Sequence, residues 1–232
     1  ALGDIVHAMV VLQFIKKHNP KIIIDWVVDE GFNQLLELNP NINKVHSINL
    51  KKAKKKKSLF VLFNELRKVR QFSQYDVVID MQGLIKSAVI SRLIPSYVTI
   101  GFDKSSLREK FASFLYNKTF QCGYDENVIE RNIALIAFAL ELNISKLEIM
   151  NKVPFLHSSE KYVNTKISST KKNVLLIPGA SVDSKIYPTK KFAELAKESQ
   201  VNFLVIWGNE GEKVLAEKIK GMDSNINICD KL

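Results

Sequence analysis

Residues 75–93, YDVVIDMQGLIKSAVISRL, contain the pattern that decides the fold predicted for this chain. Val77 to Ile79 form a short apolar run rich in β-branched residues, which is typical of a buried strand. We expect a turn over 80–84 and a helix over 84–93 to follow this strand. Because the same alternation of strand and helix recurs along the chain, we predict an α/β fold with a mostly parallel sheet and helices on both faces.

Similar patterns extend the prediction in both directions from this segment. Near the start of the chain, one helical face is formed by apolar residues at the spacing of an amphipathic helix, namely Ile5, Ala8, Met9, Leu12 and Ile15. Further strands are expected at 22–28, 98–100, 174–177 and 203–206. Further helices are expected at 58–72, 107–116, 126–142, 188–199 and 211–220.

A polar stretch over 151–172 separates two series of these strand–helix units. It predicts one domain over 1–155, a linker over 156–172 and a second domain over 173–232. The first four residues are typical of a turn between a strand and a helix, and the second series has only two clear strands. We therefore expect that an opening strand and part of the second domain are missing from the chain.

Composition excludes several classes of protein. No apolar run approaches the roughly 18 residues of a membrane-spanning helix, and the start of the chain has no signal-peptide pattern. Cys122 and Cys229 are far apart, which favours a reducing compartment over a disulfide framework. The four histidines have no metal-ligand spacing, so no metal site is predicted.

The charge of the chain indicates an anionic partner. Thirty-four Lys and Arg residues against 24 Asp and Glu give a net charge of +10 and a pI near 9.4. Such a balance is compatible with nucleic acid, an anionic membrane or an acidic substrate. Six of the seven residues from 51 to 57 are lysines, and this run is either a solvated loop or an anion-binding segment.

Two turns in the first domain are candidates for chemistry. Asp4 follows Gly3 at the start of a helix, where it is either a helix cap or a general base at the carboxyl edge of the sheet. Asp80 and Gln82 follow the strand at 75–79, and they either bind a sugar or simply form the turn. Arg131 follows Glu130 in a helix, where a surface role within the helix is the alternative to ligand binding.

Two turns in the second domain have the composition of phosphate-facing loops. Pro178 to Ser181 follow a strand and precede Lys185, which is suited to neutralising a diphosphate. Trp207 to Glu210 follow the next strand, and Glu210 either binds a ribose diol or is an acid favoured by the helix dipole. Neither turn is a GxGxxG or Walker motif.

Taken in order, these segments resemble glycosyltransferase family 9, the bacterial ADP-heptose glycosyltransferases, and particularly the lipopolysaccharide heptosyltransferases of type I. The matching segments are ALGDIVHAM (1–9), IDWVVDEGF (24–32), YDVVIDMQGLIKSA (75–88), LREKFASFLYN (107–117), VIERN (128–132), LIPGASVDSKIYP (176–188) and IWGNEGE (206–212). They are spread across nearly the whole chain. The family's later GxDTGxxH loop has no counterpart here, and Val10 stands where the family usually has proline.

The resemblance implies a GT-B architecture, in which two Rossmann-like domains face one another across a cleft. The first domain would bind the acceptor, and the incomplete second domain would bind ADP-heptose. Asp4 matches the family's proposed catalytic base. The donor would be bound by Ala180, Ser181, Lys185, Glu210 and Leu232. The acceptor would be bound by Lys51, Lys52, Lys54, Lys55 and Arg131. We include Asp80 and Gln82, from the turn described above, among the predicted acceptor-binding residues.

The implied reaction is an inverting transfer of L-glycero-D-manno-heptose from ADP-heptose to the Kdo residue of Kdo-lipid A, without a metal or other cofactor. The enzyme would work in the cytoplasm, bound peripherally to the anionic surface of the inner membrane and not to nucleic acid. One alternative is a type II or III heptosyltransferase with a heptose acceptor. Another is a basic nucleic-acid-binding protein, although the chain has no recognised nucleic-acid-binding motif.

Overall fold

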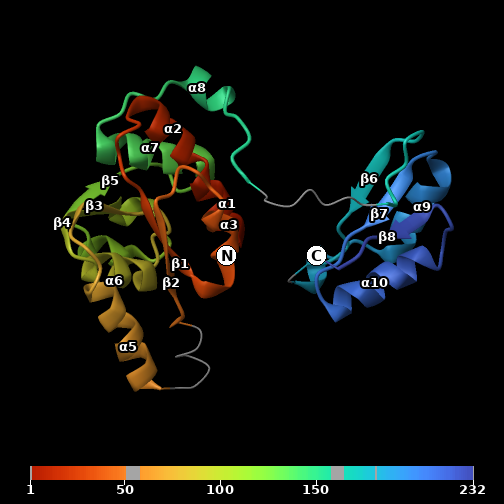
Figure 1. Cartoon of the computed structure of the whole chain (residues 1–232), viewed down its shortest axis with the longest axis horizontal. Helices are drawn as coiled ribbons and strands as arrows, with labels where there is room; N and C mark the ends of the chain where they lie inside the picture. The colour runs from red at the N-terminus through yellow and green to blue at the C-terminus, as the bar shows by residue number, and fades with distance from the viewer. Residues whose placement is uncertain (1, 51–57, 158–164, 181, 232) are drawn as a thin grey trace. The chain divides into compact units, whose positions relative to one another are not determined.

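The computed structural model describes residues 2–50, 58–157, 165–180 and 182–231. The chain divides into two compact units, residues 1–159 and 160–232 (Figure 1). Every strand pair in the described part of the chain is parallel, as the alternating sequence pattern predicts. Among the described residues, no helix has the length and apolar character needed to cross a membrane.

The first unit contains two parallel sheets. One pairs β1 (Asp25–Asp29) with β2 (Lys44–Ile48), and the other has the order β3 (Tyr75–Asp80), β4 (Ser96–Phe102), β5 (Lys118–Phe120). Its helices are α1 (Leu2–Met9), α2 (Val11–His18), α3 (Gln34–Glu37), α5 (Leu59–Arg70), α6 (Ile85–Leu93), α7 (Val128–Leu140) and α8 (Lys146–Met150). Short 3-10 helices lie at η1 (Glu30–Phe32), η2 (Lys104–Ser106) and η3 (Lys110–Leu115).

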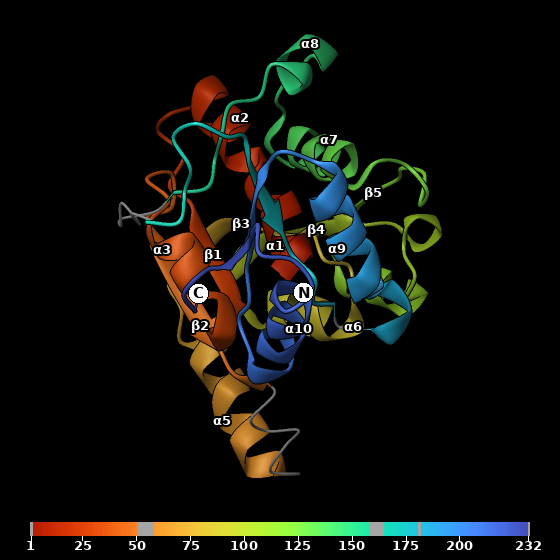
Figure 2. The same ribbon diagram turned by 90° about the vertical axis from the view of Figure 1, so that its right-hand side faces the viewer.

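Helices cover both faces of the β3–β4–β5 sheet. Successive strand residues point to opposite faces, so Ile79 packs against Ile133 and Ile136 of α7. The neighbouring residue Val78 packs with Val69 of α5 and with α6. These two layers are seen from the second direction in Figure 2, where α5 projects beyond the sheet.

The second unit is a single parallel sheet with two helices. Its strand order is β6 (Asn173–Leu176), β7 (Asn202–Val205), β8 (Ile226–Ile228). The connecting segments are η4 (Asp183–Lys185), α9 (Thr189–Glu198) and α10 (Glu210–Lys220). Phe203 and Val205 of the central strand are buried against Ala196 of α9 and Ile219 of α10, which fixes both helices on the sheet.

The structure corrects several predicted elements. The strand expected at 22–28 begins only at Asp25. The helix expected at 107–116 is the 3-10 segment η3, in which residues three apart align. Phe111 and Phe114, three residues apart in this segment, are both exposed. The strands β2, β5 and β8 were not predicted, so the second unit has three strands and not two.

Candidate functional site

The carboxyl ends of β6, β7 and β8 form one edge of the second unit. Because all three strands are parallel, the turns that follow them at 177–180, 206–209 and 229–231 emerge at this edge. Open α/β sheets bind ligands at the carboxyl ends of their strands. This edge is therefore the candidate ligand-binding site of the second unit.

A single carboxylate is bonded to one of these turns and lies close to a second. Glu212 accepts a hydrogen bond from the Gly208 backbone N–H through Oε2 at 2.7 Å, and its own N–H donates to the Asn209 side chain at 3.0 Å. A Cβ atom at Gly179 would lie 2.5 Å from Glu212 Oε1, so a larger residue in the facing turn would have to displace the Glu212 side chain. Sequence reasoning missed Glu212, although Asn209 and Glu212 have the spacing of a helix-capping pair.

Trp207 is held at the same edge by two further contacts. Its indole Nε1 donates to the carbonyl oxygen of Cys229 at 2.8 Å, which ties the turn after β7 to the turn after β8. Lys213 Nζ lies 5.3 Å from the centre of the indole ring. The turns after β7 and β8 are therefore linked by a side-chain hydrogen bond, while the Glu212 side chain lies close to the turn after β6.

The two predicted donor-binding residues with charged side chains are exposed at this edge. Lys185 is the last residue of η4, and Glu210 is the first residue of α10, in the turn that Asn209 caps. Ala180 is half-buried in the turn after β6. Ser181 and Leu232, also predicted to bind the donor, lie outside the described residues. The edge thus presents a cation and an acid to solvent.

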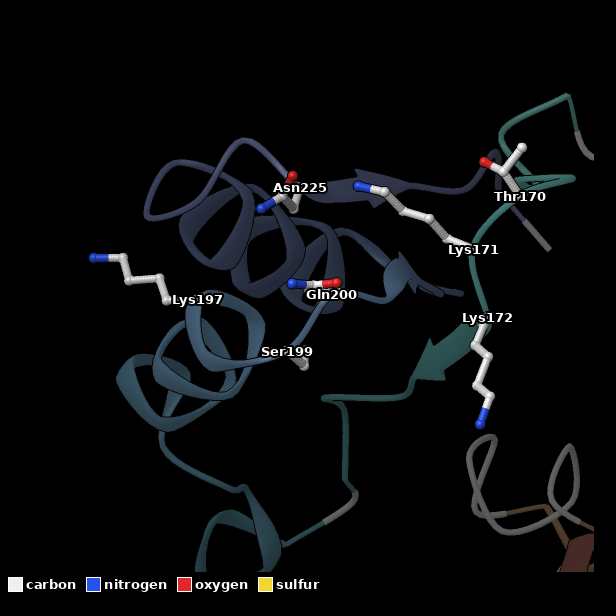
Figure 3. A pocket seen from close by; sticks show the side chains of 7 residues that line it. All are labelled: Thr170, Lys171, Lys172, Lys197, Ser199, Gln200 and Asn225. Carbon is white, nitrogen blue, oxygen red and sulfur yellow. The ribbon is translucent and has the colours of Figure 1, made fainter.

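A different pocket opens at the opposite, amino-terminal edge of the same sheet. It has a volume of about 490 Å³ and is lined mainly by polar residues that precede the strands, including Lys171, Lys172, Lys197, Ser199 and Asn225. Figure 3 shows Lys171 extending toward Asn225, whereas Lys172 and Lys197 point away from the pocket. None of the predicted site residues contributes to it.

In the first unit, Asp80 is part of the core and not of an accessible surface. Its side chain accepts hydrogen bonds from the backbone N–H groups of Gln82 and Gly83 at 2.9 and 3.2 Å and from the Tyr116 hydroxyl at 2.8 Å. Asp80 is only 4% exposed, and this burial raises its pKa while the hydrogen bonds from Ser87, Tyr116 and the turn oppose the rise. The predicted sugar contact by Asp80 is therefore corrected to a role in supporting the turn.

The rest of this turn leaves one predicted residue accessible. Gln82 is exposed. Gly83 has a φ of +65°, and a Cβ atom there would lie 2.3 Å from Leu107 Cδ2, so the turn requires glycine. Of the predicted pair, Gln82 alone remains available for a ligand.

Arg131 is also committed to contacts within the unit. Its guanidinium donates to the carbonyl oxygens of Ser106 at 2.6 Å and Tyr124 at 2.9 Å, and Nε lies 3.4 Å from Cys122 Sγ. The same group lies 4.9 Å from the centre of the Phe102 ring. These contacts fix α7 to the segment from η2 to 124. The contacts lie outside α7, so the alternative of a role within the helix alone is corrected, whereas acceptor binding by the partly exposed Arg131 stays a prediction.

Asp4 lies inside a helix. Helix α1 begins at Leu2, so Asp4 is the third residue of the helix and not its cap. Its side chain is exposed in the first turn, where the helix dipole favours a negative charge. The predicted acceptor-binding residues Lys51, Lys52, Lys54 and Lys55 lie outside the described residues. Among the described residues, no group of three or more His, Cys, Asp or Glu side chains is arranged to hold a metal ion.

Comparison with known families identifies the class of this protein. Residues 62–232 match the profile of glycosyltransferase family 9 (heptosyltransferase). A lipopolysaccharide heptosyltransferase 1 of Campylobacter coli is 38% identical to the chain, over all of the chain and 70% of the relative. The chain belongs to glycosyltransferase family 9.

Solved structures of other proteins share the fold of this family 9 glycosyltransferase. The E. coli heptosyltransferase WaaC with ADP-2-deoxy-2-fluoro heptose aligns with all of the chain and 74% of its own length, with a TM-score of 0.80 and 24% identity. A family 9 glycosyl transferase from Veillonella parvula aligns with 98% of the chain and 66% of its own length, with a TM-score of 0.76 and 16% identity. The predicted α/β fold of the GT-B type is confirmed.

Proposed function

We propose that this family 9 glycosyltransferase transfers L-glycero-D-manno-heptose from ADP-heptose to the Kdo residue of Kdo-lipid A. The observation that carries the proposal is the 38% identity to a lipopolysaccharide heptosyltransferase 1 over the whole of this chain. Membership of a sugar-transferring family favours an enzyme over the nucleic-acid-binding alternative. The acceptor, the inverting outcome and the residue roles below are parts of the proposal.

In the proposed reaction, Asp4 is the general base. Its carboxylate takes the proton from an acceptor hydroxyl, whose oxygen forms a bond to the anomeric carbon of the heptose. The bond from that carbon to the diphosphate breaks on the opposite side, and ADP leaves with the electron pair. The exposed position of Asp4 in the first turn of α1 supports this role, because a base must be within reach of the acceptor hydroxyl.

The donor would bind at the carboxyl edge of the second unit. Lys185 would place its positive charge against the leaving diphosphate, where negative charge develops in the transition state. Glu210 would accept hydrogen bonds from the ribose diol. Their exposure beside the turns that lie close to Glu212 supports these assignments. In this proposal Lys185 supplies the charge stabilisation, and no metal or other cofactor takes part.

The acceptor is proposed to bind to the first unit at the inner-membrane surface, on its cytoplasmic face. The lysine run at 51–57 would attract the carboxylate and phosphates of Kdo-lipid A. Replacing Lys54 to Lys57 by serine is then expected to raise the acceptor KM and to weaken its dependence on salt. Unchanged values would mean that the run is a solvated loop.

The proposal is tested by ADP release in the presence of ADP-heptose and heptose-free Kdo-lipid A. Asp4→Asn keeps the side-chain shape and removes the base, so we expect the rate to fall by roughly 10²-fold or more. Asp125→Asn, which changes another exposed carboxylate of the first unit, is the matched control and is expected to retain activity. Normal turnover by Asp4→Asn would refute the assignment of the base.

Acceptor choice is tested with the same assay. A type I enzyme is expected to require a Kdo-terminated acceptor, whereas a type II or III enzyme would require a heptose-terminated one. A preference for the heptose-terminated acceptor would refute the proposed Kdo acceptor but leave the proposed donor, ADP-heptose, unchanged.

A further inference from the structure

Helix α5 carries an exposed apolar surface that the reaction does not use. Phe60 and Phe63 are 72% and 63% exposed, although a phenylalanine ring is among the side chains most often buried. They are three residues apart and therefore lie on the same face of the helix. Neither side chain is needed for the core of the unit, because α5 packs against the unit through Val69 on its opposite face.

The same face continues as a row of cations. Arg67 and Arg70 follow Phe60 and Phe63 at helical spacing, so the four side chains form one stripe along α5. Both arginines are exposed, and neither has an ion-pair partner among the residues that the structure describes. Lys68, which points elsewhere, is paired with Glu65 at 2.6 Å.

The position of α5 makes this stripe accessible to a flat surface. Both views show α5 projecting from the first unit, with its amino-terminal half farthest from the sheet (Figures 1 and 2). Its carboxyl-terminal half is anchored, because Glu65 is buried and accepts a hydrogen bond from the Asn49 N–H at 3.0 Å. The two phenylalanines thus lie on the protruding half of a helix that is held firmly at its other half.

The charge of α5 and the residues just before it indicates the kind of partner that the stripe would bind. From residue 51 to residue 70 the sequence has nine cations and one acid, a net charge of +8, whereas the whole chain has a net charge of +10. The excess of cations over acids in the protein is therefore concentrated in and just before α5. A helix with exposed aromatic rings and adjacent cations is suited to the interface of an anionic bilayer, where rings enter between head groups and cations meet lipid phosphates.

We propose that the α5 stripe, formed by Phe60, Phe63, Arg67 and Arg70, docks this enzyme on an anionic lipid bilayer by inserting its two phenylalanine rings into the interface. The inference rests on the proposed function in one respect, that the acceptor is a lipid of the membrane. It goes further by assigning the contact to particular apolar side chains. Docking at this helix would bring the first unit, which is proposed to bind the acceptor, to the surface that holds it.

The inference is tested by flotation of the purified protein with vesicles of phosphatidylglycerol and phosphatidylcholine, compared with phosphatidylcholine alone. We expect Phe60→Ser/Phe63→Ser to lower the partition onto anionic vesicles by about tenfold or more. The variant lacks the favourable free energy of transferring two phenyl rings from water into the bilayer interface. Phe60→Leu/Phe63→Leu is expected to restore most of the binding. Arg67→Glu/Arg70→Glu is expected to remove the preference for anionic vesicles.

The matched control is Phe111→Ser/Phe114→Ser. This pair has the same residue type and spacing, with exposures of 74% and 72%, but it lies on η3 and not on α5. Equal loss of binding in the two pairs, or unchanged binding of the α5 variant, would overturn the inference. A change from dimer to monomer in the α5 variant would also overturn it, because the stripe would then bind a second copy of the chain. Binding to neutral vesicles as strong as to anionic vesicles would overturn it as well.

A separate measurement distinguishes failure of the inference from failure of the proposed function. ADP release with Kdo-lipid A dispersed in detergent is expected to be unchanged in Phe60→Ser/Phe63→Ser, whereas release with the acceptor in anionic vesicles is expected to fall through a higher KM. Activity in detergent with no effect in vesicles would refute the docking surface alone. Inactivity of the wild-type protein in both assays would refute the proposed function, while the flotation result would still decide the docking surface.

Discussion

Replacement of Arg131 by alanine separates a structural role from a ligand-binding role for this residue. The substitution removes hydrogen bonds to Ser106 O and Tyr124 O and the weak contact with Cys122 Sγ. Each hydrogen bond contributes about 0.5–1.5 kcal/mol. The guanidinium over Phe102 adds about 0.5–1 kcal/mol at a partly exposed site. We therefore expect the free energy of unfolding of the first unit to fall by about 1.5–4 kcal/mol.

The two tryptophans of the chain make this effect measurable in one unit at a time. Trp26 lies in β1 of the first unit and Trp207 lies in the second, so a Trp207→Phe background leaves Trp26 as the reporter of the first unit. Urea denaturation followed by Trp26 fluorescence is expected to show a lower midpoint for Arg131→Ala with a similar slope. Arg131→Lys is expected to lie between Arg131→Ala and the wild type, because lysine is a point charge without the planar arrangement of donors.

Arg108→Ala is the control, since Arg108 is an exposed arginine of the same unit and most such changes alter stability by less than about 0.5 kcal/mol. The structural assignment of Arg131 would be refuted by an Arg131→Ala variant with a wild-type midpoint and a raised acceptor KM. That result would return Arg131 to the acceptor site that the family resemblance implies.

Three further predictions concern stability. Gly83→Ala is expected to destabilise the first unit by about 2–4 kcal/mol in urea denaturation, because φ of Gly83 is +65° and a Cβ atom would overlap Leu107. A wild-type midpoint would contradict this geometry. Tyr116→Phe removes the hydroxyl that donates to the buried carboxylate of Asp80, so a loss of about 1–3 kcal/mol is expected by the same measurement, and a smaller loss would mean that water replaces the hydroxyl. The hydrogen bond from Lys17 lowers the pKa of Glu148 to about 2, below its ordinary value of 4.5, so its stabilising effect is complete above pH 4.5 and is lost as the pH falls toward 2. Glu148→Gln is expected to flatten the acid side of the stability curve over that range, and an unchanged curve would show that this ion pair does not contribute.

The central part of the fold is predictable from sequence because it depends on local patterns. The runs in β3, β4, β6 and β7 are apolar and β-branched, which identifies buried strands without knowledge of their neighbours. By contrast, β5 and β8 have three residues each and lie at sheet edges. Such short segments become strands only through pairing with β4 and β7, which no local pattern reveals.

The same distinction applies to the candidate site. The exposed positions of Lys185 and Glu210 follow from their places after strands, which are visible in the sequence. The internal roles of Asp80 and Arg131 depend on Tyr116, which is 36 residues from Asp80, and on Ser106, which is 25 residues from Arg131. A polar residue in a turn or helix has the same sequence signature whether its partner is a ligand or a distant part of the chain.

The side-chain contacts of the three turns in the second unit have a consequence for the entropy of the proposed donor binding. Glu212 accepts a hydrogen bond in the turn after β7 and lies close to Gly179 in the turn after β6, and Trp207 joins the turns after β7 and β8, so these loops are ordered when the unit folds. A ligand that binds to loops already in place loses less affinity to conformational ordering. Titration calorimetry of ADP would then show a small entropic penalty in the wild type and a larger one in Glu212→Ala, because in that variant the nucleotide itself must immobilise the turns.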